Sequence, residues 1–505
     1  MQDLLLGVDA GTTNIKSVAL AADGEERYRS ARENTVARPE PGWAEQSLPA
    51  TWERTCETVR EVVGSLGEDE RIAAVGVTGQ GDGCWALDSD GEPARDAILW
   101  SDGRAASVVE AWTGSGTADR IAEICGSAVF PGASAAILAW LKDERPREYG
   151  RIDTVLSCKD WLKYRLTGER TTDYTDASMP YLDVGAGVYS DDVLDLAGIP
   201  EVADARPRLV AGPEVVGRVT ATAAGETGLA EGTPVVSGLL DVIASAVGSG
   251  VAAPGGSSSV VGTTSLNQTF LGEPDTSPVG VGFTMALGFD SLWSRAMASM
   301  TGTPNLDWAV ETIAPTGDFE AVEEAVADVP PGSDGVVYLP FLSGAGERAP
   351  FLDADARAGL MGLEPDHGWA TVLRAVYEGV ALALRDCYAA IPADPERVAV
   401  SGGGARSPFW CQLFADCLGT EIAVTAGEEL GAKGVALLAG VGTGRYPDLE
   451  TAVERTVSTA RTYEPRPDHE AFYAEWYDLY TDTYEAMFEP WAERAALLSR
   501  LDPPA

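Results

Sequence analysis

The sequence has little positive charge. Its 505 residues include 36 lysines and arginines against 78 aspartates and glutamates, which gives a net charge of −42. Lysine occurs only at positions 16, 142, 159, 163 and 433. Such a surface repels nucleic acids and anionic membranes, so we expect neither as a partner. The acidic residues are dispersed among periodic apolar ones rather than gathered in blocks, which indicates a folded chain whose surface is adapted to high salt.

Histidine and patterned cysteines are also scarce. The two histidines, His367 and His469, lie far apart in polar segments, and the seven cysteines are scattered without Cys-x-x-Cys spacing. These absences argue against serine–histidine hydrolysis, histidine-ligated metal catalysis, a zinc site and a disulfide framework. The chemistry therefore has to depend on carboxylates, backbone amides and hydroxyl groups.

Long apolar runs are missing as well. No segment reaches the ~20 uninterrupted apolar residues of a membrane span. The nearest, residues 238–253, is interrupted by Asp241 and several glycines. The first residues carry neither a basic region nor a cleavage site, and they resemble the start of a strand more than a signal peptide. We therefore expect a cytoplasmic protein.

The patterns that are present predict an α/β fold. Short apolar strands alternate with amphipathic helices, and the length exceeds the roughly 250–300 residues that one hydrophobic core supports. The predicted strands are residues 4–8, 15–20, 72–77, 84–87, 97–100, 234–237, 258–261, 265–270 and 397–400, and the predicted helices are 51–66, 159–166, 241–247, 368–389, 407–418, 432–439 and 469–498. The glycine-rich segment 248–256 suggests a boundary between a domain at 1–248 and one at 255–446, followed by a helical extension at 447–505.

Two turns could hold phosphate. Residues 9–13 read Asp-Ala-Gly-Thr-Thr between two predicted strands, and residues 262–264 read Gly-Thr-Thr in a similar place in the second half. A glycine turn lets backbone N–H groups converge on an anion, and threonine adds hydroxyl donors. Asp9, at the end of its strand, could hold Mg²⁺ through water. An ordinary hairpin with an aspartate cap would explain the first turn equally well.

Two further segments follow buried strands. Asp241 lies between a strand and an apolar helix, where it could act as a general base or serve only as a helix N-cap. Residues 402–405 read Gly-Gly-Gly-Ala and precede a helix that opens with Ser407 and Pro408. This arrangement lets backbone approach a flat or anionic ligand, although a plain strand–helix turn would have the same pattern.

Side chains suited to a sugar lie at two other strand ends. Gln80 and Asp82 follow the strand predicted at 72–77, and Trp100 ends the strand predicted at 97–100. Amide and carboxylate groups can hydrogen-bond hydroxyls, and an indole can pack on the apolar face of a sugar. Surface turns with an interior tryptophan are the alternative.

The order of these segments resembles that of the FGGY carbohydrate kinases, a family that includes glycerol, xylulose, ribulose and erythritol kinases. The resemblance covers about residues 3–445 and includes the segments 41–46, 159–168, 340–350, 375–379 and 431–434. It implies two ribonuclease-H-like domains of the actin-like ATPase fold that flank a catalytic cleft, with ATP bound by the second domain and a sugar or polyol by the first.

The resemblance also implies roles for individual residues. Asp241 would be the general base, would contact the acceptor and, with Asp9, would lie at the Mg²⁺ site. Acceptor contacts would come from Gln80, Asp82 and Trp100. The ATP contacts implied by the resemblance are Gly11, Thr12, Thr13, Lys16, Gly262, Thr263, Thr264, Gly402, Gly403, Gly404 and Ala405.

The acceptor stays open at this stage. The chain carries Gly81-Asp82 where xylulose kinases often have Met-His and glycerol kinases have Arg-Glu. This pair, with the segments 345–348 and 431–434, more closely resembles the L-xylulose and erythritol kinase branch of the family. A ketopentose such as xylulose is our first expectation, with erythritol or glycerol as alternatives. A non-catalytic actin-like nucleotide-binding protein is a further alternative. Members of the family are often dimers, so a homodimer is possible.

Overall fold

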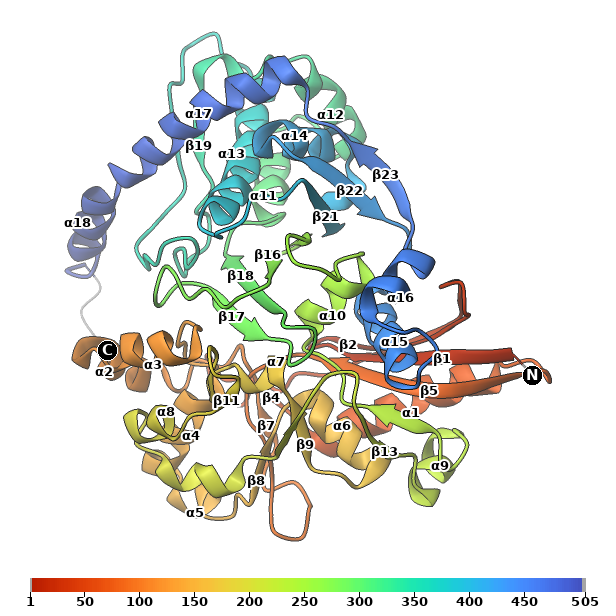
Figure 1. The fold of residues 1–505 in the computed structure, drawn as a ribbon. Coiled ribbons are helices and arrows are strands. Elements are labelled where there is room, and N and C mark those ends of the chain that lie inside the picture. Colours follow the sequence, from red (N-terminus) through yellow and green to blue (C-terminus); the bar gives the residue numbers. More distant parts are fainter. Residues whose placement is uncertain (1, 502–505) are drawn as a thin grey trace. The chain divides into compact units, whose positions relative to one another are not determined.

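The computed structural model describes residues 2–501, which form two compact units. Unit 1 comprises residues 2–254, 270–295 and 426–458, and unit 2 comprises residues 255–269, 296–425 and 459–501. Each unit is therefore assembled from separate stretches of the chain, whereas the domains expected above were continuous segments. Both units combine a mixed sheet with helices, so the predicted α/β class is confirmed (Figure 1).

The main sheet of unit 1 has six strands in the order β13-β14-β5-β1-β2-β3. Four of them were predicted. The strands are β1 (Gln2–Ala10), β2 (Asn14–Leu20), β3 (Glu26–Glu33), β5 (Glu70–Gly79), β13 (Val215–Arg218) and β14 (Pro234–Val236). β1 pairs antiparallel with β2 and parallel with β5. β3 escaped prediction because only one of its eight residues is fully buried, which leaves no apolar alternation.

Helices cover both faces of this sheet. α10 (Asp241–Gly248) and α15 (Leu430–Gly442) lie on one face, and α1 (Leu48–Gly64) and α6 (Cys158–Thr167) lie on the other (Figure 1). The core between α1, α6 and the sheet includes Leu6, Val59, Val77 and Trp161.

Glycines set the distance between α15 and its neighbours. A Cβ atom on Gly7 would lie 1.8 Å from the carbonyl oxygen of Ala432, and one on Gly76 would lie 2.0 Å from that of Val435. A Cβ atom on Gly434 would lie 1.9 Å from the carbonyl oxygen of Ala244 in α10. Side chains at these crossings would force the backbones apart, so the glycines allow α15 to pack directly on β1, β5 and α10.

The rest of unit 1 includes a second core, which contains Ile121, Leu138, Tyr181 and Val193. Its elements are β4 (Glu45–Gln46), β6 (Trp85–Leu87), β7 (Ala97–Ile98), α2 (Ala106–Ser115), α3 (Thr117–Cys125), α4 (Ser134–Glu144), α5 (Pro146–Tyr149), β8 (Thr154–Leu156), β9 (Thr171–Asp173), α7 (Tyr174–Ala177), β10 (Leu182–Asp183), β11 (Val188–Tyr189), α8 (Asp191–Leu196), the 3₁₀ helix Pro200–Ala205, β12 (Arg208–Val210), α9 (Ala221–Thr227), β17 (Phe283–Ala286) and α16 (Leu449–Thr456).

Unit 2 contains the strands β16-β15-β21-β22-β23 in that order. They are β15 (Ser257–Val261), β16 (Ser265–Leu271), β21 (Arg397–Gly402), β22 (Glu421–Thr425) and β23 (Thr459–Tyr463). The other elements are β18 (Trp293–Ser299), α11 (Pro304–Thr312), α12 (Phe319–Ala327), the 3₁₀ helix Ser333–Gly335, β19 (Val337–Leu339), β20 (Gly359–Met361), α13 (Trp369–Ala389), the 3₁₀ helix Gly404–Arg406, α14 (Pro408–Leu418), α17 (Pro467–Glu485) and α18 (Phe488–Leu498). β16 and β18 each include a point at which the chain passes from one unit to the other.

The prediction of one helix over residues 469–498 was wrong. The chain forms α17 and α18, which are separated at Ala486 and Met487. Pro490 explains the break, because its ring would clash with the carbonyl oxygen of Ala486 in a continuous helix and it has no N–H to donate.

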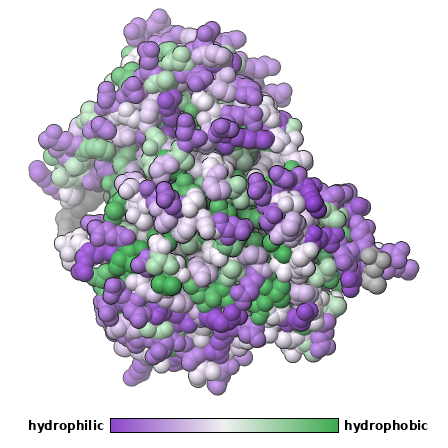
Figure 2. All heavy atoms as spheres, viewed as in Figure 1, coloured by the Kyte–Doolittle hydropathy of each residue, from purple (hydrophilic) through white to green (hydrophobic). Residues whose placement is uncertain are grey.

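The surface has the polar character expected from the composition. On the face shown in Figure 2, hydrophilic residues predominate over apolar ones. Within residues 2–501, no helix combines the length and apolar composition required to cross a bilayer.

We predict that Gly434→Ala destabilises the protein because the added methyl group meets backbone in α10. Overpacking of this kind costs about 1–3 kcal/mol. The matched control is Gly225→Ala in α9, where an added Cβ has nothing within 4 Å and should be neutral or stabilising. Thermal unfolding of the two variants provides the measurement. Equal melting temperatures for both would contradict the packing described here.

Candidate functional site

Asp9 lies at the end of β1, within the β1–β2 hairpin of unit 1. Its Oδ1 atom is buried and has no hydrogen-bond partner among the described residues. A Cβ atom on Gly431 would lie 2.7 Å from Asp9 Oδ2 and 3.4 Å from Ser245 Oγ, so the first turn of α15 lies next to both Asp9 and α10. Burial raises the pKa of Asp9 to about 6, while the positive charge of Lys16 opposes the shift. An unpartnered buried carboxylate oxygen is not explained by a turn-capping role.

Asp241 is the first residue of α10. Leu240, rather than Asp241, is the N-cap, and Asp241 Oδ1 accepts a hydrogen bond from the N–H of Val242 at 2.7 Å. Burial, together with the negative charge of Asp9, raises the pKa of Asp241 to about 8. The structure therefore gives no support to the N-cap alternative and brings the carboxyl group of Asp241 under the influence of Asp9.

The pair fits a divalent cation with oxygen preference. Asp9 supplies a free buried oxygen and Asp241 a second carboxylate, both hard ligands of the kind Mg²⁺ prefers. Among residues 2–501, no group of three or more His, Cys, Asp or Glu side chains is arranged to hold a metal ion. Mg²⁺ usually keeps several waters and substrate oxygens as ligands, so two protein carboxylates are sufficient for it.

Thr12 is the centre of a hydrogen-bonded group that joins four segments of unit 1. Its hydroxyl donates to Gln80 Oε1 at 2.9 Å and accepts from Trp100 Nε1 at 3.0 Å. Gln46 Nε2 donates to the carbonyl oxygen of Thr12 at 2.7 Å, and its Oε1 accepts from Gln80 Nε2 at 2.7 Å. Trp100 is 38% exposed, so its indole remains available to a ligand. Three of the predicted residues are therefore brought together.

Gln46 was not predicted as a site residue. It lies in β4, in the segment 41–46 that contributed to the family resemblance. That segment was the available signal. The pairing of Gln46 with Gln80, 34 positions away, cannot be read from local pattern.

Asp82 occupies a separate place. It has a positive φ of 54° and lines a cavity of about 40 Å³ together with Ser134, Ser157, Asp176 and Tyr181. Neither Gln80 nor Trp100 lines this cavity. Burial, with the negative charge of Asp176, holds the pKa of Asp82 well above its ordinary value. In this structure Asp82 therefore faces a buried carboxylate, Asp176, which the sequence analysis did not single out.

Gly11 and Thr13 lie in the turn between β1 and β2, and Lys16 lies in β2. Lys16 pairs with Asp9 in the register of β1 and β2, and its Nζ lies 2.6 Å from Glu429 Oε2. Glu429 is the N-cap residue of α15. The carbonyl oxygen of Gly11 accepts a hydrogen bond from Asn34 Nδ2 at 3.1 Å, and the hydroxyl of Thr13 accepts one from Asn14 Nδ2 at 3.2 Å. Lys16 is thus held at the start of α15.

In unit 2 the corresponding hairpin joins β15 and β16. The N–H of Gly262 donates to the carbonyl oxygen of Thr264 at 2.9 Å, and Thr303 N–H donates to the carbonyl oxygen of Gly262 at 2.7 Å. A Cβ atom on Gly302 would lie 2.8 Å from the carbonyl oxygen of Thr263. The predicted strands at 258–261 and 265–270 are confirmed, and the turn is packed against the loop before α11.

The glycine segment after β21 adjoins this hairpin. Gly402 has a φ of 84°, and a Cβ atom on it would lie 2.6 Å from the carbonyl oxygen of Val261. Gly403, Gly404 and Ala405 lead to Ser407, whose Oγ accepts a hydrogen bond from Trp410 N–H at 2.9 Å as the N-cap of α14.

A cavity of about 840 Å³ opens at the same loop within unit 2. Its lining includes Gly403, Ser407, Phe409, Tyr377, Leu306 and Thr303. Small-molecule pockets typically measure about 300–1,000 Å³ and combine apolar walls with a few polar groups. The glycine backbone, the aromatic rings and the N-terminus of α14 give this cavity both apolar and polar lining groups.

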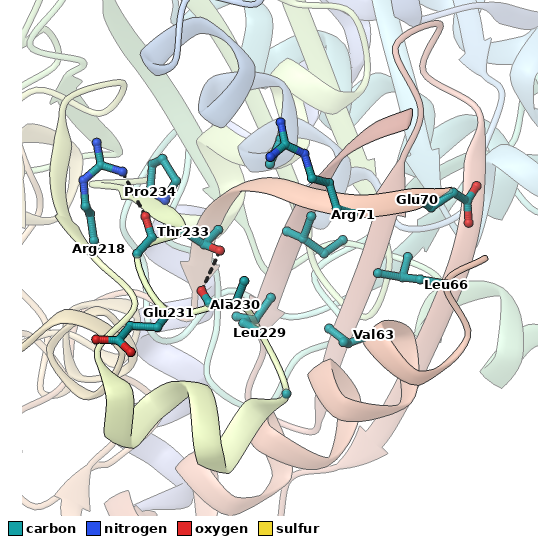
Figure 3. Close-up of a pocket in the computed structure, with 14 residues that line it drawn as sticks. Val63, Leu66, Glu70, Arg71, Arg218, Leu229, Ala230, Glu231, Thr233 and Pro234 are labelled. Atoms are coloured by element: carbon teal, nitrogen blue, oxygen red, sulfur yellow. Dashed lines mark hydrogen bonds between the residues drawn. The ribbon is translucent and has the colours of Figure 1, made fainter. Parts of the chain in front are cut away.

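Another cavity of unit 1, of about 430 Å³, lies away from these residues (Figure 3). It is lined by Val63, Leu66 and Leu229 and by the start of β5 around Glu70 and Arg71. Gln80 follows the opposite end of β5, about 30 Å along the strand. This cavity is therefore not part of the group around Thr12 and Gln80.

We predict that Asp82→Asn stabilises the protein increasingly as pH rises. An unfolded aspartate ionises near pH 4, whereas folded Asp82 binds its proton more tightly, so the wild type loses stability between pH 4 and its raised pKa. Asparagine stays neutral and tolerates a positive φ. The difference in melting temperature should grow by several °C from pH 5 to pH 8, at roughly 2–4 °C per kcal/mol.

The control for this measurement is Asp90→Asn, at an exposed turn position. It should show no pH-dependent difference. A difference for Asp82→Asn that stays flat or reverses with pH would contradict the buried environment of Asp82.

Comparison with known proteins covers both halves of the chain. Residues 4–248 match the FGGY family of carbohydrate kinases, N-terminal domain, and residues 256–443 match the C-terminal domain of the same family. The chain is 31% identical to an erythritol kinase of Brucella abortus over 98% of both proteins. It is 30% identical to the L-xylulose/3-keto-L-gulonate kinase of Escherichia coli over 96% of this chain and 98% of that protein.

A solved structure supports the same relationship. The xylulose kinase from Rhodospirillum rubrum superposes with a TM-score of 0.90 and 28% sequence identity, over 97% of this chain and 100% of that one. These relatives are named for different acceptors, so similarity does not identify the acceptor of this chain. Both domain matches together show that the chain belongs to the FGGY family of carbohydrate kinases.

Proposed function

We propose that this kinase transfers the γ-phosphoryl group of ATP to a hydroxyl of a small sugar or polyol, with Asp241 as the general base. The observation that carries the proposal is the position of Asp241 at the start of α10 beside Asp9, with its pKa raised to about 8 by burial and by the charge of Asp9. A general base works best when its pKa lies near the operating pH.

Asp9 would contribute to a Mg²⁺ site, with Asp241 as a second oxygen ligand. Bound there, Mg²⁺ would supply charge stabilisation for the phosphate oxygens. Asp9 supports this role with a buried Oδ1 atom that has no partner among residues 2–501. The chain's own part is to keep this carboxylate oriented and poorly solvated, and the close packing of Gly431 against the other oxygen, Oδ2, favours this.

Kinases of this family use ATP. We propose that the adenosine part occupies the cavity next to Gly403 and Ser407 in unit 2, where Phe409 and Tyr377 offer aromatic surface. The phosphate contacts proposed for unit 2 are in the Gly262–Thr264 turn. Those proposed for unit 1 are the backbone of Gly11, Thr12 and Thr13 and the side chain of Lys16. Turns of this kind present converging N–H groups to anions.

The acceptor would contact Gln80, Trp100 and Asp241. Trp100 supports this role because part of its indole is exposed while its N–H is fixed by Thr12. We retain Asp82 as an acceptor residue, although it faces Asp176 in this structure. A ketopentose such as xylulose is the first candidate acceptor. Erythritol is the second, because the erythritol kinase of Brucella abortus is 31% identical to this chain, and glycerol is the third.

Three further properties are proposals from the sequence. The net charge of −42 suggests a protein that works at high salt. The chain is also proposed to be cytoplasmic and to form a homodimer. ADP-release activity measured across acceptors at low and molar KCl would test the first of these.

We predict that Asp241→Asn binds ATP normally and loses about 10²–10⁴-fold in kcat, because the amide cannot accept the hydroxyl proton. A coupled ADP-release assay with xylulose, erythritol and glycerol measures turnover, and tryptophan fluorescence measures nucleotide binding. The control is Asp195→Asn on the exposed side of α8, which should keep wild-type turnover. Wild-type kcat in Asp241→Asn would disprove the assignment of the base.

A further inference from the structure

Two of the five lysines of this chain are completely buried in unit 1. Lys159 and Lys163 lie on α6 and have no exposed side-chain surface. Lys159 Nζ lies 2.9 Å from Asp160 Oδ1, 2.6 Å from Asp173 Oδ1 and 2.5 Å from Asp176 Oδ2. Lys163 Nζ lies 2.9 Å from Asp160 Oδ1. We call these five residues the buried ion-pair cluster.

Such a cluster contributes little net stability to a fold. Removing charged groups from water costs several kcal/mol per ion, and apolar residues of the same volume often stabilise a protein at least as well. A chain that has almost no lysine on its surface nevertheless places two here. The contacts of the cluster with its neighbours indicate what it does.

One set of contacts leads from Lys159 to the residue before Asp241. Asp173 Oδ1 pairs with Lys159, and Asp173 Oδ2 accepts hydrogen bonds from the hydroxyl of Thr175 at 2.5 Å and from its N–H at 2.9 Å. Because the hydroxyl proton of Thr175 points to Asp173, its oxygen is free to accept. It accepts the N–H of Leu240, the N-cap residue of α10, at 2.8 Å.

A second set of contacts holds the same segment from its other end. Lys163 Nζ donates to Ser237 Oγ at 3.1 Å. Between the two anchors, the hydroxyl of Thr78 donates to the carbonyl oxygen of Leu239 at 2.6 Å. The four residues 237–240, which join β14 to Asp241, are therefore held at three points.

We propose that Thr175, oriented by Asp173 and Lys159, is a positioning residue that holds the backbone before Asp241 in place for phosphoryl transfer, while Lys163 holds the same segment at Ser237. This proposal rests on the proposed role of Asp241 as general base. Misplacement of a reacting group by about 1 Å can cost about 10²-fold in rate, so a single lost anchor has a measurable consequence.

The test compares Thr175→Val, which removes the hydroxyl and keeps the shape, with Thr175→Ser, which restores it. The matched control is Thr227→Val. Thr227 is also buried, and its hydroxyl also makes two hydrogen bonds, in α9: it donates to the carbonyl oxygen of Ala223 at 2.6 Å and accepts the N–H of Leu229 at 3.3 Å. Both valine variants lose a buried hydroxyl with two hydrogen bonds, and Thr175→Val should lose more stability because its hydroxyl donates to the carboxylate of Asp173. The control therefore shows whether loss of a buried hydroxyl elsewhere in unit 1 lowers kcat.

For Thr175→Val we expect kcat to fall by at least about ten-fold, with the KM for ATP within about two-fold of wild type. Thr175→Ser should recover most of the loss, and Thr227→Val should keep wild-type kcat. Equal kcat in the two valine variants would overturn the proposal. Should Thr175→Val fail to fold, Ser237→Ala takes its place, because it removes only the acceptor of Lys163.

Hydrogen–deuterium exchange separates this proposal from the proposed function. Peptides covering residues 237–242 should exchange faster in Thr175→Val than in the wild type, and at the wild-type rate in Thr227→Val. If the wild type phosphorylates no sugar or polyol, the proposed function fails, and the exchange result alone decides whether Thr175 anchors this segment. Unchanged exchange in Thr175→Val would overturn the proposal whatever the activity.

Discussion

The close approach of α15 to β1, β5 and α10 is the constraint on which the site in unit 1 depends. At each crossing a glycine faces a backbone carbonyl oxygen, and a single methyl group would meet that oxygen at about 2 Å, as for Gly76 and Gly434. Because the helix lies so close, Gly431 at its start lies next to both Asp9 and Ser245 of α10. The two carboxyl groups proposed for the chemistry, those of Asp9 and Asp241, are both buried, and the charge of Asp9 acts on Asp241.

The burial of Asp9 and Asp241 has consequences for charge. Burial raises the pKa of Asp9 to about 6, and burial together with the negative charge of Asp9 raises the pKa of Asp241 to about 8. A bound cation would offset the cost of ionising both carboxyl groups in this buried place. Most lysines of the chain also lie in the interior or next to acidic groups. Lys159, Lys163 and Lys433 are buried in unit 1 and Lys16 pairs with Glu429, so four of the five lysines serve the interior or the site rather than the surface.

Local patterns predicted the parts of the fold whose signals are local. The hairpin of β1 and β2, the strand β21 and the helices α13 and α14 were predicted within a few residues, because each has regular apolar periodicity or a recognisable cap such as Ser407. The break between α17 and α18 was missed, although Pro490 was the available signal. β3 was missed because an exposed edge strand carries no apolar alternation.

The site was predictable only in part, for a physical reason. Asp9, Thr12, Gln80 and Asp241 each end or begin an element, where α/β proteins place functional groups, and so they could be singled out. The contacts that orient them join residues far apart in sequence. Thr12 and Gln80 are 68 positions apart, and Thr175 and Leu240 are 65 positions apart. Nothing in a local pattern encodes such a pairing, and the contacts of Gln46 and of the buried ion-pair cluster became visible only in three dimensions.

The most direct test is a crystal structure of the protein with ADP, with Mn²⁺ as an anomalous scatterer, and with a sugar or polyol that the enzyme is found to phosphorylate. The account predicts an anomalous peak beside Asp9 and an acceptor hydroxyl within about 2.6–3.2 Å of a carboxylate oxygen of Asp241. A cation bound away from Asp9, or an acceptor whose hydroxyls all lie beyond the reach of Asp241, would contradict it.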